Sequence, residues 1–305
     1  MSATKLEFQV IDVFTSTKYT GNQLAIVHIP PMLSDTITQE QKLSVAREFN
    51  LSETIFMHDN PPDAAPDAPV RADIFTTEQE LPFAGHPTVG SSWYLLAGPG
   101  SVGKERKAIT LKTKAGPIRA VLQESGRVLE QVPLDFKEHE PIQISWFKSA
   151  QPNLQATDFA SGVDGKDAVA SVVKGVNFVL LRVNSEEALK NLQTVPGIID
   201  IPWLGEWQGF VALYAFYERE DGVVRTRFFR DTWEDAATGA AASTLGGWLG
   251  KRKGEGKWKI EIVQGVEVGR RSEIEVQVEV GSDGNVKKVE LGGEAVLVME
   301  GAIVV

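Results

Sequence analysis

The sequence predicts an α+β protein made of two similar halves, each with β-strands around one closely packed helix. Two segments carry this prediction, "AGHPTVGSSWYL" at 84–95 and "TGAAASTLGGWL" at 238–249. Each follows predicted strands, begins its helix at a glycine and runs through small residues to an aromatic and a leucine. This is a repeat of pattern rather than of sequence. A helix without a polar face is a buried helix, so we expect a curled sheet around each one.

The composition is that of a globular chain long enough for two domains. It has 305 residues, of which 42% are hydrophobic and 24% charged. No run approaches the ~20 apolar residues of a membrane span, and the start lacks the features of a signal peptide. The absence of cysteine excludes disulfides, a thiolate nucleophile and cysteine metal sites. We therefore expect a cytoplasmic protein, and its net charge of −10 argues against nucleic acid as a partner.

The first half predicts a strand pair, a capped helix and further strands. Strands are expected at 6–14, 23–29, 51–57, 70–77, 108–116 and 118–124. Thr36 and Gln39 have capping-box spacing before a helix. Leu43, Ala46 and Phe49 then share one helical face, and Asn50 follows as a stop signal.

The second half repeats this order of elements. Strands are expected at 177–183, 210–218, 223–229, 259–265 and 272–280, with a final strand pair near 295–305. Ser185 is the expected cap of a helix over 185–193. The basic stretch 250–257 is expected to be a solvated turn. Between the halves, the proline-rich stretch 132–141 is the best candidate for a domain boundary.

Two carboxylates stand out by their surroundings. Glu53, in "LSETIF", lies between apolar flanks, where burial would raise the pKa of its carboxyl toward values useful for proton transfer. Asp235 directly precedes the second glycine-led helix, where a carboxylate can accept from a substrate. The alternatives are a charge at a strand edge for Glu53 and a helix cap for Asp235.

The two helix starts and His86 allow both a functional and a structural interpretation. A helix N-terminus attracts a carboxylate, so Gly85 and Gly239 could mark a site for a small anion. Close packing explains each glycine as well. His86 could donate to a substrate at the first helix start, or be a buried structural residue. No two of the four histidines have metal-ligand spacing, so no metal site is predicted.

Five blocks, in order, resemble the phenazine-biosynthesis PhzF-like family. They are "DVFTSTKYTGNQLAIV", "LSETIF", "IFTTEQELPFAGHPTVG", "EDAATGAAASTLGGWL" and "QGVEVGRRSEI". The resemblance implies the diaminopimelate epimerase-like fold, with two pseudo-symmetric domains, each a curled, mostly antiparallel sheet around a central helix. It also implies that the last strand returns to the first domain. The expected domains are thus 1–130 plus 286–305, and 131–285.

The resemblance also implies a role for each site residue. Glu53 takes the position of the general acid/base, with His86 and Asp235 as further catalytic residues. The substrate-binding positions fall on Asn22, Gly85, Thr238, Gly239 and Ala240. Gly85 and Ala240 stand where epimerase relatives carry two cysteines, so a two-thiol racemase mechanism is excluded. Gln23 and Ala236 replace prolines that the family usually has, and Ala240 replaces a common serine.

The function implied is a cofactor-independent and metal-independent isomerase of biosynthetic type, acting between the two domains of a homodimer. It would move a proton on a small anionic carboxylate substrate, with Glu53 removing and returning it. Two alternatives stay open. One is an epimerase or racemase with Glu53 and Asp235 as opposed bases. The other is a non-catalytic small-molecule-binding protein, an alternative that the missing hydroxyl at Ala240 supports.

Overall fold

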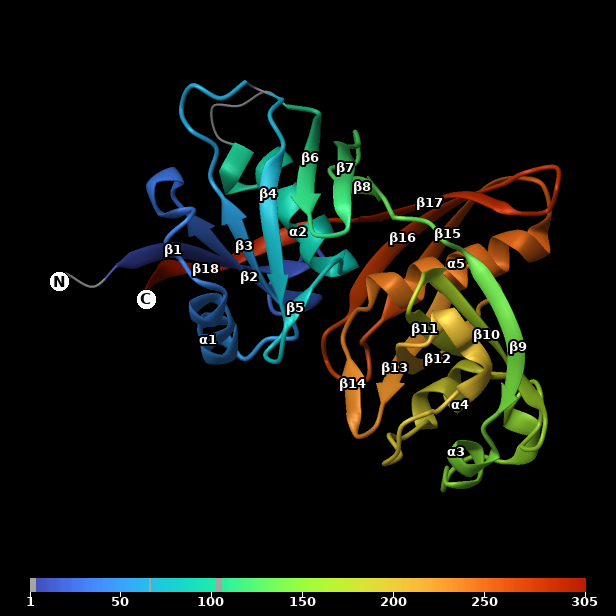
Figure 1. Ribbon diagram of the computed structural model, residues 1–305. Helices are drawn as coiled ribbons and strands as arrows, with labels where there is room; N and C mark the ends of the chain where they lie inside the picture. The colour runs from blue at the N-terminus through green and yellow to red at the C-terminus, as the bar shows by residue number, and fades with distance from the viewer. Residues whose placement is uncertain (1–3, 66, 102–105) are drawn as a thin grey trace. The chain divides into compact units, whose positions relative to one another are not determined.

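The computed structural model describes residues 4–65, 67–101 and 106–305 (Figure 1). It divides into two compact units. Unit 1 comprises Met1–Gln131 and Gly292–Val305, and unit 2 comprises Val132–Leu291. The chain thus leaves unit 1 once, forms unit 2 as one continuous segment, and returns.

Unit 1 is a sheet with two principal helices. Its strands are β1 (Lys5–Val13), β2 (Asn22–Ile29), β3 (Thr54–His58), β4 (Val70–Phe75), β5 (Glu80–Leu81), β6 (Ala108–Thr113), β7 (Gly116–Leu122), β8 (Val128–Gln131) and β18 (Ala295–Val304). Its helices are α1 (Gln39–Phe49) and α2 (Gly85–Leu96), with short 3₁₀ turns at Pro31–Leu33 and Pro99–Ser101. α1 packs on β3 and β4, whereas α2 contacts β1, β2, β3, β6, β7, β8 and β18. The sheet therefore surrounds α2, as the small side chains of that helix predicted.

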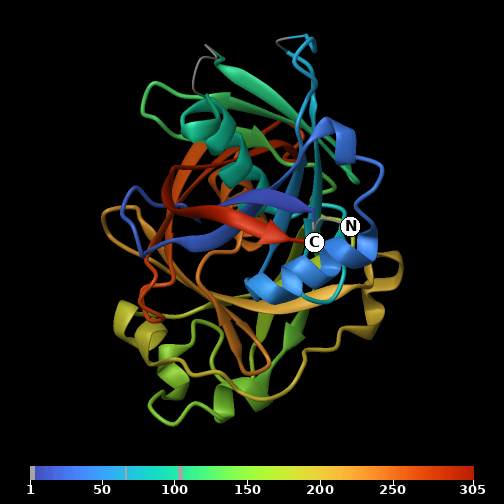
Figure 2. The same cartoon turned by 90° about the vertical axis from the view of Figure 1, so that its left-hand side faces the viewer.

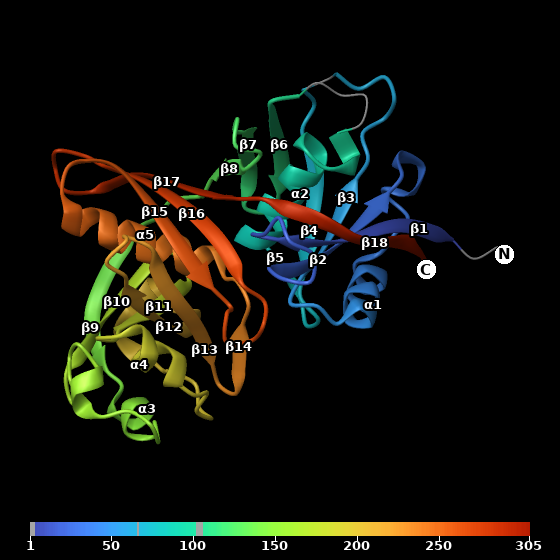
Figure 3. The same ribbon diagram turned by 180° about the vertical axis from the view of Figure 1, so that it is seen from behind.

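Unit 2 has the same kinds of element. Its strands are β9 (Lys137–Gln143), β10 (Lys166–Val173), β11 (Val176–Arg182), β12 (Phe210–Glu218), β13 (Val224–Arg230), β14 (Trp233–Asp235), β15 (Gly256–Gln264) and β16 (Ser272–Val280). β17 (Val286–Gly293) crosses the division between the units. The helices are α3 (Ser145–Ser149), α4 (Glu186–Asn191) and α5 (Gly239–Lys253), with 3₁₀ turns at Ala156–Asp158 and Pro202–Trp207. α5 lies alongside β15 and β16 (Figure 3) and also contacts β10 and β11.

The strand pairing repeats between the units. In unit 1, β1–β2, β3–β4 and β6–β7 are antiparallel, whereas β2–β3 and β4–β6 are parallel. In unit 2, β10–β11, β12–β13 and β15–β16 are antiparallel, whereas β11–β12 and β13–β15 are parallel. In each unit the glycine-led helix comes before the strand that completes the second parallel pair. Thus α2 precedes β6, and α5 precedes β15. The predicted α+β class with two similar, mostly antiparallel halves is confirmed.

Close packing explains the glycines inside both long helices. A Cβ on Gly90 in α2 would lie 2.6 Å from Val13 Cγ2 and 2.8 Å from Leu24 Cδ2. A Cβ on Gly246 in α5 would lie 2.5 Å from Val276 Cγ1. Neighbouring strands thus occupy the space that a side chain would need, because protein interiors are packed to the density of crystals.

The end of the chain completes unit 1. β18 pairs antiparallel with β1 along the whole length of β1, from Lys5 opposite Val304 to Val13 opposite Ala295. The amide of Val305 donates to the carbonyl of Thr4 at 2.9 Å, so these two residues lie side by side. Figure 2 shows the blue strand β1 next to the red strand β18. The domain bounds expected from the sequence, 1–130 plus 286–305 and 131–285, stay a prediction.

Several local predictions need correction. The capping box of α1 uses Thr38 and Gln41, because the Thr38 hydroxyl accepts from the Gln41 amide, two residues beyond the expected pair Thr36 and Gln39. Asn50 ends this helix in the left-handed conformation, as expected. The basic stretch 250–257 is not a turn throughout, because 250–253 form the last turn of α5, where cations suit the helix dipole. The final strand pair expected near 295–305 is one continuous strand, β18. The strands β5, β8, β9, β10, β14 and β17 and the helix α3 were not predicted.

Candidate active site

Glu53 stands just before β3, in a buried part of unit 1. The next five residues form β3 and are all buried, and the Glu53 side chain keeps only 19% of its surface exposed. Burial raises the pKa of the Glu53 carboxyl from 4.5 to about 7. A carboxyl with that pKa is present in both protonation states near neutral pH, so it can accept a proton and return it.

His86 meets Glu53 from the first turn of α2. Its Nδ1 lies 3.2 Å from Glu53 Oε2, and only 4% of its side chain is exposed. The other ring nitrogen, Nε2, lies 3.3 Å from the backbone carbonyl oxygen of Gln23. A carbonyl oxygen only accepts, so Nε2 carries a hydrogen and donates it. The ring thus presents Nδ1 to the carboxyl of Glu53.

This arrangement couples the protonation of the two side chains. With a neutral imidazole, Nδ1 accepts a hydrogen from the neutral Glu53 carboxyl. With an imidazolium ion, Nδ1 donates to the carboxylate. The contact between Nδ1 and Oε2 lies next to a helix start, and it contains a proton whenever one of the two groups supplies it.

Gly85 and Asn22, the two remaining predicted residues of unit 1, are next in sequence to His86 and to Gln23. Gly85 is the first residue of α2 and is buried, with Ala84 as the N-cap residue. Asn22 begins β2 beside Gln23 and is 6% exposed. The structure therefore brings together Glu53, His86 and the backbone at the start of β2 and α2. The predicted binding roles of Asn22 and Gly85 stay predictions.

In unit 2 the predicted residues also form a cluster. Asp235 ends β14 and is 8% exposed, and its Oδ2 accepts a hydrogen bond of 2.6 Å from the hydroxyl of Thr238. Thr238 is the N-cap residue of α5, and Gly239 and Ala240 are the first two residues of that helix. The catalytic role of Asp235 and the binding roles of Thr238, Gly239 and Ala240 stay predictions.

Sequence reasoning missed Gln264, which organises this second cluster. Its Nε2 donates to the carbonyl of Asp235 at 3.0 Å and to the Thr238 hydroxyl at 3.2 Å. Its Oε1 accepts from the Thr238 amide at 3.2 Å and from the Tyr214 hydroxyl at 2.9 Å. Both hydrogens and both lone pairs of this fully buried amide are used, so the segment before α5 is held in one conformation. The signal was present, since Gln264 opens the matching block "QGVEVGRRSEI".

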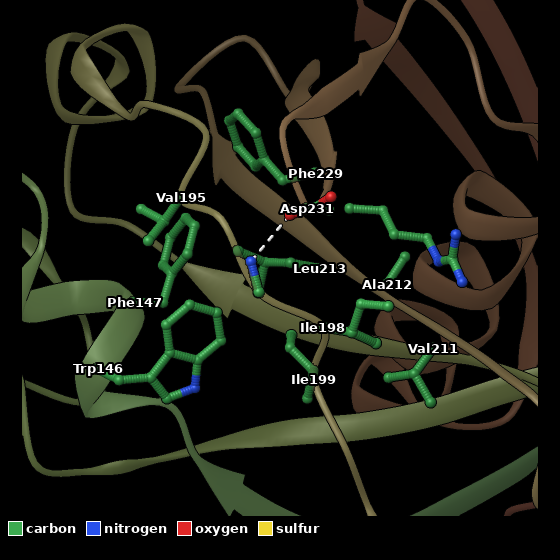
Figure 4. Close-up of a pocket in the computed structure, with 12 residues that line it drawn as sticks. Trp146, Phe147, Val195, Ile198, Ile199, Val211, Ala212, Leu213, Phe229 and Asp231 are labelled. Carbon is green, nitrogen blue, oxygen red and sulfur yellow. Dashed lines mark hydrogen bonds between the residues drawn. The ribbon is translucent and has the colours of Figure 1, made fainter.

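A small pocket of unit 2 is lined by none of these residues (Figure 4). Its volume is about 10 Å³, the space of a single water molecule. Trp146, Phe147, Leu213 and Phe229 line it, and Asp231 accepts from the Gly197 amide at its rim. It is too small and too apolar for a carboxylate substrate.

Among the described residues, no group of three or more His, Cys, Asp or Glu side chains could hold a metal ion. Within the same residues, no helix is long and apolar enough to cross a membrane.

Comparison with known proteins identifies the family. The family model described as phenazine biosynthesis-like protein, PhzC-PhzF, matches residues 11–301. The chain therefore belongs to the PhzF family, and it is an isomerase of that family.

Individual relatives match along nearly their whole length. The chain is 33% identical to an uncharacterized isomerase of Mesorhizobium japonicum, over 97% of this chain and 98% of that protein. It is 32% identical to the trans-2,3-dihydro-3-hydroxyanthranilate isomerase of Pseudomonas aeruginosa, over 96% of this chain and 98% of that one.

Solved structures show the shared fold. The phenazine biosynthesis protein of the PhzF family from Bacillus anthracis matches with a TM-score of 0.76 at 20% identity, over 99% of this chain and all of that one. A probable proline racemase from Agrobacterium radiobacter matches with a TM-score of 0.59 at 15% identity, over 97% and 92% of the two chains. The predicted diaminopimelate epimerase-like fold is thereby confirmed.

Proposed function

We propose that this protein isomerises a small carboxylate substrate without a cofactor, with Glu53 as the general acid/base. The observation that carries the proposal is the contact of 3.2 Å between Glu53 Oε2 and His86 Nδ1, together with the raised pKa of Glu53. A pKa of about 7 is close to what proton transfer in both directions requires at neutral pH.

The reaction begins when the Glu53 carboxylate removes a proton from a carbon next to a carbonyl or a double bond. The electron pair moves along the conjugated system, and the neutral carboxyl returns the proton to another carbon on the same face. One group is enough for both steps, and such acid–base catalysis contributes about 10²–10⁴ in rate. His86 supports the change of charge on Glu53 through Nδ1, since its orientation is held by the Gln23 carbonyl.

The first test follows carbon-bound hydrogens by NMR in D₂O. The protein is incubated with a panel of small cyclic and α-amino carboxylic acids. The panel includes trans-2,3-dihydro-3-hydroxyanthranilate, the compound in the name of the Pseudomonas aeruginosa relative. We expect one class of compound to exchange hydrogen for deuterium and to isomerise, and Glu53→Gln to lower the rate by about 10²–10⁴.

Two comparisons make this test sharp. Glu48→Gln, on the exposed side of α1, removes one carboxylate elsewhere in unit 1 and should retain full activity. Undiminished exchange in Glu53→Gln would show that another group is the base. Binding of a panel compound without any exchange would favour a non-catalytic binding protein.

The same experiment separates isomerisation from epimerisation. Inversion at a stereocentre without a shift of the double bond would assign the epimerase alternative, in which Asp235 is the second base. Asp235→Asn should then abolish exchange from one of the two enantiomers only. The cytoplasmic location and the homodimer stay predictions.

A further inference from the structure

Glu130 is a buried carboxyl that the proposed mechanism does not use. It lies on β8 with no exposed surface, between Val128 and Val132 on the same buried face. Its Oε1 forms a hydrogen bond of 2.6 Å with the hydroxyl of Thr88 in the first turns of α2. Its Oε2 has no hydrogen-bond partner among the described residues.

Thr88 connects this carboxyl to the backbone at the start of α2. Its hydroxyl oxygen lies 2.9 Å from the carbonyl oxygen of Ala84 and 3.0 Å from that of Gly85. The backbone bond from the Thr88 amide to the Ala84 carbonyl is longer, at 3.4 Å. The side chain of Thr88 therefore holds the first turn where the backbone bond is weak.

The number of hydrogens on these groups determines which group donates in each hydrogen bond. A threonine hydroxyl has one hydrogen, and both carbonyls only accept, so that hydrogen goes to the backbone. Glu130 must then be the donor to Thr88, which requires a neutral carboxyl. An ionised Glu130 would take the hydroxyl hydrogen away from both carbonyls and leave a buried charged Oε2 without a partner, at high cost. Burial also raises the pKa of Glu130 well above its usual value.

The carbonyl of Gly85 belongs to the same planar peptide as the amide of His86. Because the peptide is planar and trans, the direction of the carbonyl sets the direction of the amide N–H. Pro87 has no amide hydrogen, so the first three residues of α2 supply N–H groups only from Gly85 and His86. A small rotation of this peptide would therefore move both the binding N–H and the imidazole ring.

We propose that Glu130 is a positioning residue, which acts as a neutral hydrogen-bond donor through Thr88 to orient the Gly85–His86 peptide of the active site. This inference rests on the proposed function of Glu53 and His86. Glu130 is then a carboxyl that does not contact the substrate and that stays neutral during the reaction.

The test uses two pairs of variants in the full-length protein. Glu130→Gln and Thr88→Ser retain a donor and a hydroxyl, whereas Glu130→Leu and Thr88→Val remove them at similar volume. We expect kcat/KM to fall by about 10-fold to 100-fold in the second pair, mainly through kcat, since a misplacement of ~1 Å can cost as much. The first pair should stay close to wild type.

A second readout does not depend on catalysis. NMR spectra should show changed amide and ring nitrogen signals of His86 in Glu130→Leu and Thr88→Val, and near-native signals in Glu130→Gln and Thr88→Ser. Val89→Ala, a fully buried apolar neighbour in the same helix, is the control for a general loss of packing. It should lower stability and leave the His86 signals in place.

The outcomes separate this inference from the proposed function. A wild-type protein without proton-transfer activity, but with His86 signals that depend on Glu130 and Thr88, would overturn the function and support the positioning. Native His86 signals in a folded Thr88→Val protein would overturn the positioning. Equal changes in Val89→Ala would overturn it as well. If Glu130→Leu does not fold, Thr88→Val decides the question.

Discussion

Burial of Glu53 favours proton transfer but lowers the stability of the fold at neutral pH. The burial that gives its carboxyl a pKa of about 7 also penalises the ionised form. The folded state binds the Glu53 proton more tightly than the unfolded chain does. Stability is therefore lost as the pH rises from 4.5 to about 7. The shift corresponds to about 3 kcal/mol of unfolding free energy.

We therefore predict that Glu53→Gln stabilises the protein under alkaline conditions. The free energy of unfolding should exceed that of wild type by up to about 3 kcal/mol near pH 8, and the difference should shrink toward about pH 4. Urea unfolding of both proteins at a series of pH values measures this. A difference that stayed constant over that range would contradict the assigned cause, and Glu48→Gln serves as the control for the loss of one carboxylate.

Gln264 allows a prediction on the second cluster. Replacing it by leucine leaves the half-buried Thr238 amide without this acceptor and removes one of the two hydrogen bonds of the buried Tyr214 hydroxyl, which should cost about 1–3 kcal/mol in unfolding free energy. Gln277→Leu on the adjacent strand β16 is the matched control, since that side chain is only half-buried. Equal losses in the two variants, measured by urea unfolding, would argue against a special role for Gln264.

At the scale of elements, the small residues of α2 are not equivalent. Gly90 has no space for a Cβ, because Val13, Leu24 and Ile11 surround it. Ser91 is also fully buried, but its hydroxyl has no hydrogen-bond partner among the residues described. The two neighbours should therefore respond in opposite ways to the same replacement.

We predict that Gly90→Ala destabilises and that Ser91→Ala does not. Overpacking costs about 1–3 kcal/mol, of which better helix propensity offsets up to about 1 kcal/mol. Removing an unsatisfied buried hydroxyl should leave the free energy of unfolding unchanged or raise it by about 1 kcal/mol. Chemical denaturation of the two variants gives the sign directly, and a stabilised Gly90→Ala would show that the strands around α2 can move apart.

The elements that could be predicted were those with a local signal. Glycine starts and small side chains identified both buried helices, and Ser185 does cap α4 through the Ala188 amide. β9 was missed because most of its residues are polar and exposed or half-exposed, with only Ile142 fully buried. The cap of α1 was misplaced by two residues because two Thr-x-x-Gln patterns overlap there, and the helix uses the second, Thr38 and Gln41.

The site was predictable to a similar degree. The sequence and its family resemblance pointed to Glu53 and His86, and the structure adds the contact between them. Gln264 was missed because it is a polar residue within a strand pattern, where periodicity alone does not distinguish a partnered buried side chain from a solvated one. Glu130 was missed because no strand was predicted over 128–131.

At the scale of the whole molecule, the pairing of β1 with β18 brings Thr4 and Val305 together. We predict that a circular permutant folds. A short glycine–serine linker joins Val305 to Thr4, and new ends are opened in the exposed turn between Asp283 and Gly284. Circular dichroism and thermal unfolding should match wild type. The contrasting variant ends after Gly293 and so lacks β18, and it should fail to form a stable unit 1.

The place of β18 has a consequence for the nascent chain. On the ribosome, unit 2 is translated as one continuous stretch, whereas the N-terminal segment of unit 1 waits for a strand that is translated after unit 2. That segment therefore leaves the exit tunnel before unit 2 and completes its fold after it, the reverse of the usual N-terminal-first order of domain folding. During that interval one edge of β1 lacks its partner, and such an unpaired edge can pair with other chains.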